Sequence, residues 1–182
     1  MRKLFSFMVV TLDGYYEGPD GEFDWPNVDD EFNDFAISQL NDIDTLIFGR
    51  ATYEGMASYW PTPAALEGDP VVADRMNSIP KVVFSSSLDA AEWQNTRLAK
   101  GKASEAVAEL KAQDGGNILK FGTGELDRTL LEQGLVDEFQ FWLIPIVVGR
   151  GERLFEGFET TLELLETTRF KSGVVALKYA PK

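Results

Sequence analysis

The sequence predicts an α/β protein of one domain, residues 1–182, whose mostly parallel β-sheet is covered by helices on both faces. Apolar runs of strand type alternate with helical stretches along the chain, which is typical of parallel sheets. The segment "TTRFKSGVVALKYA" predicts two strands joined at 171–173. This antiparallel hairpin makes the predicted sheet mixed. A chain of 182 residues is long enough to bury one core.

The N-terminal half is predicted to alternate between strands and helices. Strands are predicted at "KLFSFMVVTL", which ends at an Asp-Gly turn, and at the short run "DTLIFG". Helices are predicted at "VDDEFNDFAISQLNDI", "ATYEGMASYW" and "VVADRMNSI". Acidic residues crowd the first turn of the first of these helices, where the helix dipole favours them. The three prolines of "PTPAALEGDP" predict a surface loop.

The alternation continues from Lys81 onward. Strands are predicted at "KVVFSSS", "NILKFG" and the long run "EFQFWLIPIVV". Helices are predicted at "ASEAVAELKAQ", which ends at Gly115-Gly116, and at "ELDRTLLEQG". Gly134 stands where a glycine commonly closes a helix.

Composition narrows the chemistry. The chain has no Cys and no His, which excludes disulfides, thiolate chemistry, the usual zinc sites and triads that need His. Acid–base work falls to carboxylates, Tyr, Lys or water, and no metal is expected. The net charge of −13 argues against a nucleic acid partner, because Lys and Arg must neutralise its phosphates. A small anionic ligand remains compatible, since salt screens charges over about 8 Å.

The location is predicted to be cytoplasmic, with no membrane contact. No apolar run approaches the roughly 20 residues that a membrane span needs. The N-terminal stretch "MRKLFSFMVVTLDG" is interrupted by polar residues and lacks a small-residue cleavage site.

Polar residues follow four predicted strands, and ligands of open α/β sheets bind beyond such strand ends. The sets are Thr11, Asp13 and Gly14; Gly49, Arg50 and Thr52; Ser85 to Ser87; and Gly122 to Glu125. Two of them run directly into a helix, whose N-terminus favours anions. Each set also has a simpler interpretation, namely an Asp-Gly turn, a solvated Arg beside a glycine, a serine turn and a tight glycine turn. Two anion corners together favour a phosphate-bearing ligand.

Five segments occur in an order that resembles the dihydrofolate reductase superfamily. They are "TLDGYYEGPDGEFDW", "LIFGRATYEGM", "IPKVVFSSSL", "ILKFGTGELDRTLLEQGLVDEF" and "LIPIVVGRGERLF". More closely, the chain resembles the riboflavin-biosynthesis reductase branch, the RibD C-terminal domain-like proteins. The resemblance runs from about Lys3 to Tyr179, and its specificity lies in the order of the five motifs.

The resemblance implies a dihydrofolate reductase-like three-layer fold, NADPH as hydride donor and often a homodimer. It implies hydride transfer to a small heterocyclic or ribosylamino substrate, as in 5-amino-6-(5-phosphoribosylamino)uracil reductase of riboflavin biosynthesis. The alternatives are dihydrofolate reductase proper and a nucleotide-binding module without catalysis. A deaminase activity is excluded, because its zinc site needs His and Cys.

The resemblance also implies which residues bind the cofactor. Gly49, Arg50 and Thr52 match a Gly-Arg-x-Thr corner that holds a cofactor phosphate. Ser85 and Ser86 match the strand end that meets the adenosine ribose and its 2′-phosphate. From their position in the sequence, the nearby 96–97 and Lys81 are further candidates for the 2′-phosphate.

A second cofactor element is implied at the glycine loop. Gly122, Thr123 and Gly124 match the loop under the pyrophosphate, although Thr123 here splits the family's adjacent glycines. Glu125 belongs to this candidate set as the helix-start residue, yet an acid there disfavours a phosphate directly above it. Asp127 stands where the last glycine of a dinucleotide fingerprint would fall.

The substrate side is less defined. Asp13 matches the family's Leu-Asp-Gly element beside the substrate pocket, and it is a candidate catalytic proton donor. Trp25 is a candidate for the pocket wall, with Tyr16 and Trp60, although large aromatics more often belong to a core. No acid among 29, 30 and 34 is singled out as the pterin-binding acid of dihydrofolate reductase proper. Lys120 and Arg150 are guesses for binding a substrate phosphate.

Overall fold

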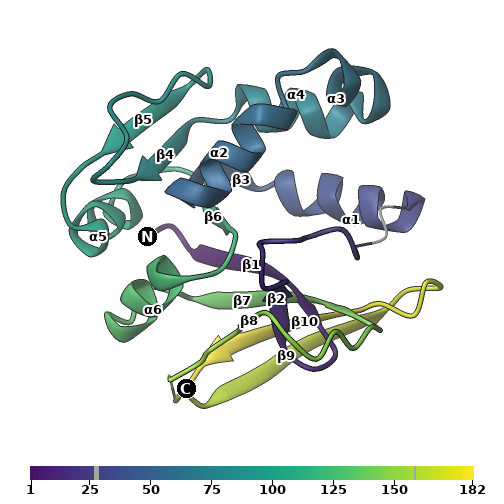
Figure 1. The fold of residues 1–182 in the computed structure, drawn as a ribbon. Helices are drawn as coiled ribbons and strands as arrows, with labels where there is room; N and C mark the ends of the chain where they lie inside the picture. The colour runs from purple at the N-terminus through teal and green to yellow at the C-terminus, as the bar shows by residue number, and fades with distance from the viewer. Residues whose placement is uncertain (27–28, 158) are drawn as a thin grey trace. The chain divides into compact units, whose positions relative to one another are not determined.

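The computed structural model describes residues 1–26, 29–157 and 159–182, which fall into two compact units (Figure 1). The first unit consists of Met1–Lys3 and Val28–Phe121, and the second unit of Leu4–Asn27 and Gly122–Lys182. Each unit therefore combines segments that are distant in the sequence. The prediction of one domain over 1–182 stays a prediction.

The described residues of the first unit form four parallel strands and five helices. Its strands follow the spatial order β5 (Thr96–Ala99), β4 (Lys81–Phe84), β3 (Ile43–Gly49) and β6 (Asn117–Phe121). Its helices are α1 (Asp30–Leu40), α2 (Arg50–Tyr59), α3 (Pro63–Gly68), α4 (Pro70–Ser78) and α5 (Ala103–Ala112). Helix α2 packs on β3 and β4, and α4 contacts both α1 and α3 (Figure 1).

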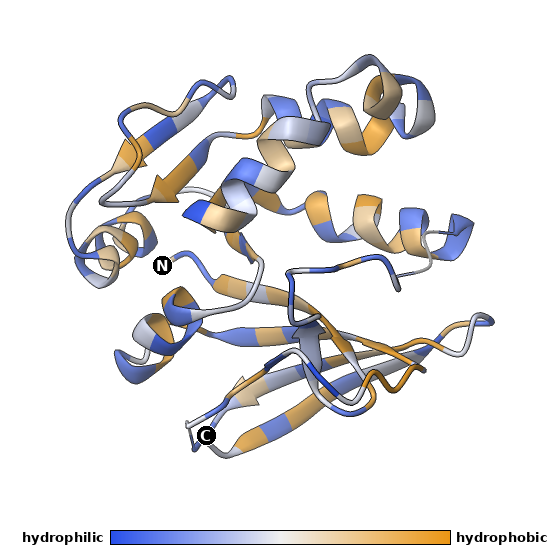
Figure 2. Ribbon diagram, viewed as in Figure 1, coloured by the Kyte–Doolittle hydropathy of each residue, from blue (hydrophilic) through white to orange (hydrophobic). Residues whose placement is uncertain are grey.

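Apolar residues make the core of the first unit. Phe48 of β3 has no exposed surface, and its ring packs on Phe121 and Trp93 at centroid distances of 6.0 and 5.9 Å. Figure 2 shows this concentration of apolar residues on the strands. Asn77 joins the surrounding loops, since its side chain donates to the carbonyl of Trp60 and accepts from the indole of Trp93.

The described residues of the second unit form a mixed set of strands and one helix. Strand β1 (Leu4–Thr11) pairs in parallel with β7 (Glu138–Ile144). The antiparallel strands are β10 (Val175–Pro181), which pairs with β7, and β9 (Leu162–Arg169), which pairs with β10. A separate ladder joins β2 (Tyr15–Glu17) to β8 (Glu152–Arg153), and α6 (Glu125–Glu132) is the helix.

Helix α6 ends as its sequence predicts. Gly134 has a φ of 62°, which glycine adopts readily. Its N–H donates to the carbonyl of Leu131, and the N–H of Leu135 donates to that of Leu130. These two bonds form a Schellman motif, which satisfies the carbonyls at the helix end.

The predicted class is confirmed: the fold is α/β with mixed, mostly parallel strands and a C-terminal antiparallel hairpin. The loop predicted at 61–70 is wrong in part, because α3 forms there. Pro63 occupies its first turn, where no N–H is needed, and the hydroxyl of Thr62 accepts from the N–H of Ala65. The long strand predicted from Glu138 ends at Ile144, since Pro145 has no N–H to donate to a ladder.

Strands β2, β5 and β8 were not predicted, because none has a continuous apolar run. Among the described residues, no helix combines the length and the apolar character that crossing a bilayer requires. The predicted helix that starts at 28 begins with a residue outside the described ranges, and α1 itself begins at Asp30.

Candidate functional site

The corner between β3 and α2 is built as an anion site. Gly49 ends β3 and stands at the N-cap of α2, so no side chain caps the first turn. That turn holds no acidic residue, and its first residue is Arg50. The N–H groups at the start of a helix carry partial positive charge and lack partners within the helix. This corner therefore presents N–H donors, a guanidinium and the half-buried Thr52 to one small region.

Arg50 is available to a ligand. Its side chain is 54% exposed, and its guanidinium lies 3.6 Å from the carboxylate of Glu54 one turn along α2. An exposed pair of this kind contributes little to stability, about 0.3–0.5 kcal/mol. A phosphate can therefore replace Glu54 as the partner of Arg50 at small cost.

The serines after β4 form the simpler structure that their sequence allows. The hydroxyl of Ser85 accepts hydrogen bonds from the N–H groups of Ser87 and Leu88 at 3.2 and 3.1 Å. It thus closes a local serine turn. Ser86 is exposed. Contact of Ser85 or Ser86 with a cofactor stays a prediction.

The glycine turn before α6 is already partly occupied by a carboxylate. Gly122 and Gly124 have φ values of 83° and 144°, which a side chain would strain. The side chain of Asp127 accepts from the N–H of Gly124 at 3.1 Å and from the hydroxyl of Ser6 at 2.5 Å. Asp127 is only 4% exposed. A buried anion therefore already uses one of the N–H groups predicted for a pyrophosphate.

The rest of that turn is also less suited to an anion than the α2 corner. Glu125 is exposed at the first position of α6, next to the buried carboxylate of Asp127. Two acids in the first turn stabilise the helix through its dipole, and they oppose a phosphate there. Binding of a cofactor by Gly122, Thr123, Gly124 and Glu125 stays a prediction.

Asp13 anchors a loop of the second unit. Its carboxylate accepts from the hydroxyl of Thr11 at 2.7 Å and from the N–H groups of Gly149 and Val148 at 2.8 and 3.3 Å. Partial desolvation acts to raise the pKa of Asp13, but these hydrogen bonds outweigh it and hold the pKa below its ordinary value. An ionised carboxylate is a poor proton donor at neutral pH, so this geometry suits Asp13 to positioning the loop.

A pair of acids that the sequence analysis did not single out lies on the small β2–β8 ladder. Glu17 faces Glu152 directly across the two strands. Burial first, and the charge of Glu152 second, raise the pKa of Glu17. Burial, followed by the charges of Glu17, Glu152 and Asp127, raises the pKa of the neighbouring Tyr16. This cluster favours protonated side chains, in contrast to Asp13.

The backbone of Gly151, just before β8, lies unusually close to the backbone of Glu17 at the end of β2. Gly151 has a φ of 131°, and a Cβ built on it would overlap the carbonyl oxygen of Glu17. Only glycine allows this approach, which seats Glu17 against β8. No sequence signal could identify the pair, because it depends on register between segments about 135 residues apart.

Trp25 presents a polar atom without a partner. Its indole Nε1 is buried, and among the described residues nothing accepts a hydrogen bond from it. Its ring packs edge-on against Phe23, with centroids 6.0 Å apart. A buried indole N–H normally finds a partner, so Trp25 offers a donor to a ligand. A role of Trp25 in substrate binding stays a prediction.

The predicted helpers of the serine strand lie elsewhere in the first unit. Lys81 begins β4 and pairs in register with Thr96, which begins β5. Ser85 follows the other end of β4. Strands β4 and β5 are parallel, so Lys81, Thr96 and Arg97 all lie toward the amino ends of these strands, whereas Ser85 follows the carboxyl end of β4. The suggestion that these three residues assist Ser85 at a 2′-phosphate is therefore wrong.

The structure does not single out Asp29, Asp30 or Asp34 as the pterin-binding acid of dihydrofolate reductase proper. The side chain of Asp29 caps this helix by accepting from the N–H of Phe32 at 2.9 Å. Asp30 and Asp34 are exposed. All three acids therefore have the roles expected of an N-cap and a solvated helix face.

Comparison with known protein families places the chain. The model of the RibD C-terminal domain matches residues 2–176. The chain belongs to the RibD C-terminal domain family. The uncharacterized protein YyaP of Bacillus subtilis (strain 168) is 33% identical over 182 residues, which cover 98% of this chain and 94% of YyaP.

Solved structures of this family and of its wider fold agree. A putative riboflavin biosynthesis protein from Shewanella sp. PV-4 matches with a TM-score of 0.73 and 26% identity, covering 99% of both chains. Dihydrofolate reductase from Enterococcus faecalis, in complex with NADP(H) and RAB-propyl, matches with a TM-score of 0.63 and 19% identity, over 99% of this chain and 96% of that one. The latter likeness shows the fold alone. The RibD C-terminal domain member described here thus has the predicted dihydrofolate reductase-like fold.

Proposed function

We propose that the protein is an NADPH-dependent reductase that transfers a hydride to a small heterocyclic or ribosylamino substrate. The substrate of 5-amino-6-(5-phosphoribosylamino)uracil reductase represents the proposed class of substrate. The observation that carries this proposal is the α2 corner, where an uncapped helix N-terminus and the exposed Arg50 meet at a strand end. Family membership and the NADP(H) complex of the Enterococcus faecalis reductase support the same cofactor.

The residues of this corner fit a phosphate of a dinucleotide. A Cβ built on Gly49 would meet no atom within 4 Å, so space is open above the first turn of α2. Arg50 can donate two parallel hydrogen bonds to a phosphate, and the hydroxyl of Thr52 can donate a third. NADPH, when bound, supplies the hydride.

The chain's own residues bind the cofactor phosphate, position a loop and supply a proton. Arg50 and the first turn of α2 bind the phosphate. Asp13 stays ionised and keeps the loop at 148–149 in place. Burial and the charge of Glu152 raise the pKa of Glu17, which makes Glu17 a better proton donor than Asp13. The proposal thus assigns general acid catalysis to Glu17 and a positioning role to Asp13.

The first test measures cofactor binding as a thermal shift. NADPH at about 100 times its Kd stabilises a protein by about 2.7 kcal/mol, which raises the Tm of a domain of this size by roughly 5–11 °C. We expect NADPH to raise the Tm of the parent, and Arg50→Ala to reduce that shift. Arg75→Ala is the matched control, since Arg75 is also an exposed helix arginine and its loss changes the charge equally. An equal NADPH response in all three proteins would remove the α2 corner from the proposal.

The second test separates catalysis from binding. We expect the parent to oxidise NADPH with a pyrimidine ribosylamine phosphate, and Glu17→Gln to lower kcat by roughly 100-fold while leaving the NADPH thermal shift unchanged. Asp13→Asn should lower activity less. A parent that binds NADPH and turns over no pyrimidine, pterin or carbonyl substrate would indicate a nucleotide-binding module.

Three further expectations belong to this proposal. They are a cytoplasmic location, a homodimer, and a small-molecule substrate as the binding partner in place of nucleic acid or membrane. Sedimentation of the purified protein tests the homodimer, since the dimer has twice the mass of the 20.3 kDa chain.

A further inference from the structure

We propose that the first unit carries a second binding site, which takes a small organic anion at the amino ends of β3, β4 and β5. The cofactor corner of the proposed function follows the carboxyl end of β3 instead. The inference is independent of that function, because it depends on different residues. The proposal rests on a cavity, on a buried arginine whose guanidinium has unused N–H groups, and on two further cationic side chains.

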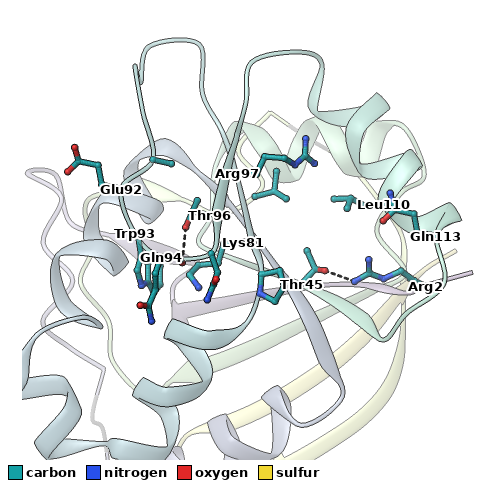
Figure 3. A pocket seen from close by; sticks show the side chains of 14 residues that line it. Arg2, Thr45, Lys81, Glu92, Trp93, Gln94, Thr96, Arg97, Leu110 and Gln113 are labelled. Atoms are coloured by element: carbon teal, nitrogen blue, oxygen red, sulfur yellow. Dashed lines mark hydrogen bonds between the residues drawn. The ribbon is translucent and has the colours of Figure 1, made fainter.

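The cavity has a volume of about 570 Å³. Pockets for small molecules usually span about 300–1,000 Å³. Residues from the N-terminal segment, the starts of β4 and β5, the preceding loop and the end of α5 line it (Figure 3). The lining includes Arg2, Lys81, Trp93, Arg97, Leu110 and Gln113.

Arg2 is a buried residue with donors that are not in use. Its side chain is only 5% exposed. Its Nε donates to the carbonyl of Gly116 at 2.7 Å, and its Nη2 donates to the hydroxyl of Thr45 at 2.6 Å and to the carboxylate of Asp44. A guanidinium has five N–H groups, so the two on Nη1 have no partner among the described residues. These two N–H groups are open to a ligand that enters the cavity.

Arg97 lies across the cavity from Arg2. It is exposed on β5, and it forms no ion pair with the described residues. Figure 3 shows its guanidinium directed over the cavity toward Leu110 of α5. Glu92 also lines the cavity, but Figure 3 shows its side chain directed away. An anion between Arg2 and Arg97 would therefore meet two guanidinium groups.

Lys81 adds a positive charge to the wall. It is 1% exposed, and its ammonium donates to the carbonyls of Asn77 and Ile79 at 3.1 and 2.7 Å. It lies 4.6 Å from the centre of the Trp93 ring. No carboxylate among the described residues contacts it. A charge in a low-dielectric wall acts further than one in water, so Lys81 makes the cavity positive on a protein of net charge −13.

These features define the ligand class. Guanidinium groups bind carboxylates and phosphates through paired N–H···O bonds. Trp93 and Leu110 supply apolar wall for an organic body, and the amide of Gln113 supplies a further polar contact. The ligand is thus a small organic molecule that carries one carboxylate or phosphate group.

The test uses benzoate and phenyl phosphate as probes of the two anion types. Trp93 lines the cavity, so the resonance of its indole N–H in a ¹H–¹⁵N spectrum reports on occupancy. Trp93→Phe identifies that resonance among those of the four tryptophans. We expect a saturable shift with at least one probe and none with sodium chloride at equal ionic strength. The absence of a saturable shift with both probes would overturn the proposal.

Two arginine variants locate the bound anion. Arg97→Gln should weaken binding by roughly fivefold, while Arg50→Gln at the cofactor corner should leave the Kd unchanged. Arg97 is chosen over Arg2, because loss of the buried Arg2 could unfold the protein. The reverse pattern, or loss of the probe signal in the presence of saturating NADPH, would place the anion at the cofactor corner and refute a second site.

Discussion

The buried ammonium of Lys81 predicts an unusual dependence of stability on pH. Lys81 is 1% exposed, and burial lowers its pKa from 10.5 to about 8. The unfolded chain restores an ordinary lysine, which keeps its proton to higher pH. Between about pH 8 and pH 10.5 the unfolded state therefore binds more protons than the folded state, and the free energy of unfolding rises with pH.

The magnitude follows from the two pKa values. Each pKa unit corresponds to about 1.36 kcal/mol, and the ionisation curves for pKa values of about 8 and 10.5 give a gain of roughly 2.5 kcal/mol between pH 7 and pH 10. The neutral amine still has two N–H groups, enough for the carbonyls of Asn77 and Ile79 that accept from it. Deprotonation thus removes the desolvation cost and keeps both hydrogen bonds.

The assay compares the parent with Lys81→Met by urea unfolding at several pH values. Other lysines and tyrosines titrate in the same range, so the informative quantity is the difference in unfolding free energy between the two proteins. We expect the parent to gain roughly 2.5 kcal/mol on the variant between pH 7 and pH 10. Lys171→Met, at an exposed residue, serves as the control. A flat or falling difference would refute the account of Lys81 as a desolvated ammonium.

Two further substitutions test the second unit. Asp127→Ala leaves the Ser6 hydroxyl and the N–H that begins α6 without a carboxylate, so we expect a loss of roughly 3 kcal/mol and a fall in Tm of about 6–12 °C. Circular dichroism melting measures both, and an unchanged Tm would contradict the buried network. Gly151→Ala forces a Cβ onto the carbonyl of Glu17 and should cost roughly 3 kcal/mol. Gly149→Ala, also at positive φ but with open space, should cost only about 1–2 kcal/mol, and equal losses would argue against the overlap.

Local sequence signals predicted most helices and strands. Gly134 closes α6 because its φ of 62° is a local property of one residue. The apolar run of β3 predicts burial, and Phe48 is fully buried. The Thr62 cap and Pro63 were equally local, yet the prolines around them favoured a loop over the six-residue helix α3.

Short strands escaped prediction for a physical reason. The two residues of β8 and the three of β2 become a ladder only because Gly14, Tyr15 and Gly151 bring their backbones together. Nothing in either segment alone distinguishes a strand from a loop. The pairing energy belongs to the two segments together.

The residues of the candidate site likewise fall into those that local sequence predicted and those that only tertiary contacts distinguish. The Gly49-Arg50 corner could be predicted, because the end of a strand, the start of a helix and the arginine are consecutive in the chain. The acids could not be ranked, since Asp13 and Glu17 are four residues apart in similar sequence. Hydrogen bonds from Val148 and Gly149 hold one ionised, while burial and Glu152 favour a proton on the other.

The sequence by itself determined the class of fold, the family and the position of the α2 corner, because these depend on periodicity, motif order and neighbouring residues. Only the tertiary structure decided that Asp127 occupies the glycine turn, that Glu17 faces Glu152, and that Arg2 and Arg97 line one cavity. Each of these depends on contacts between segments that are distant along the chain. Burial and charge, which set pKa values and ligand chemistry, arise from those contacts alone.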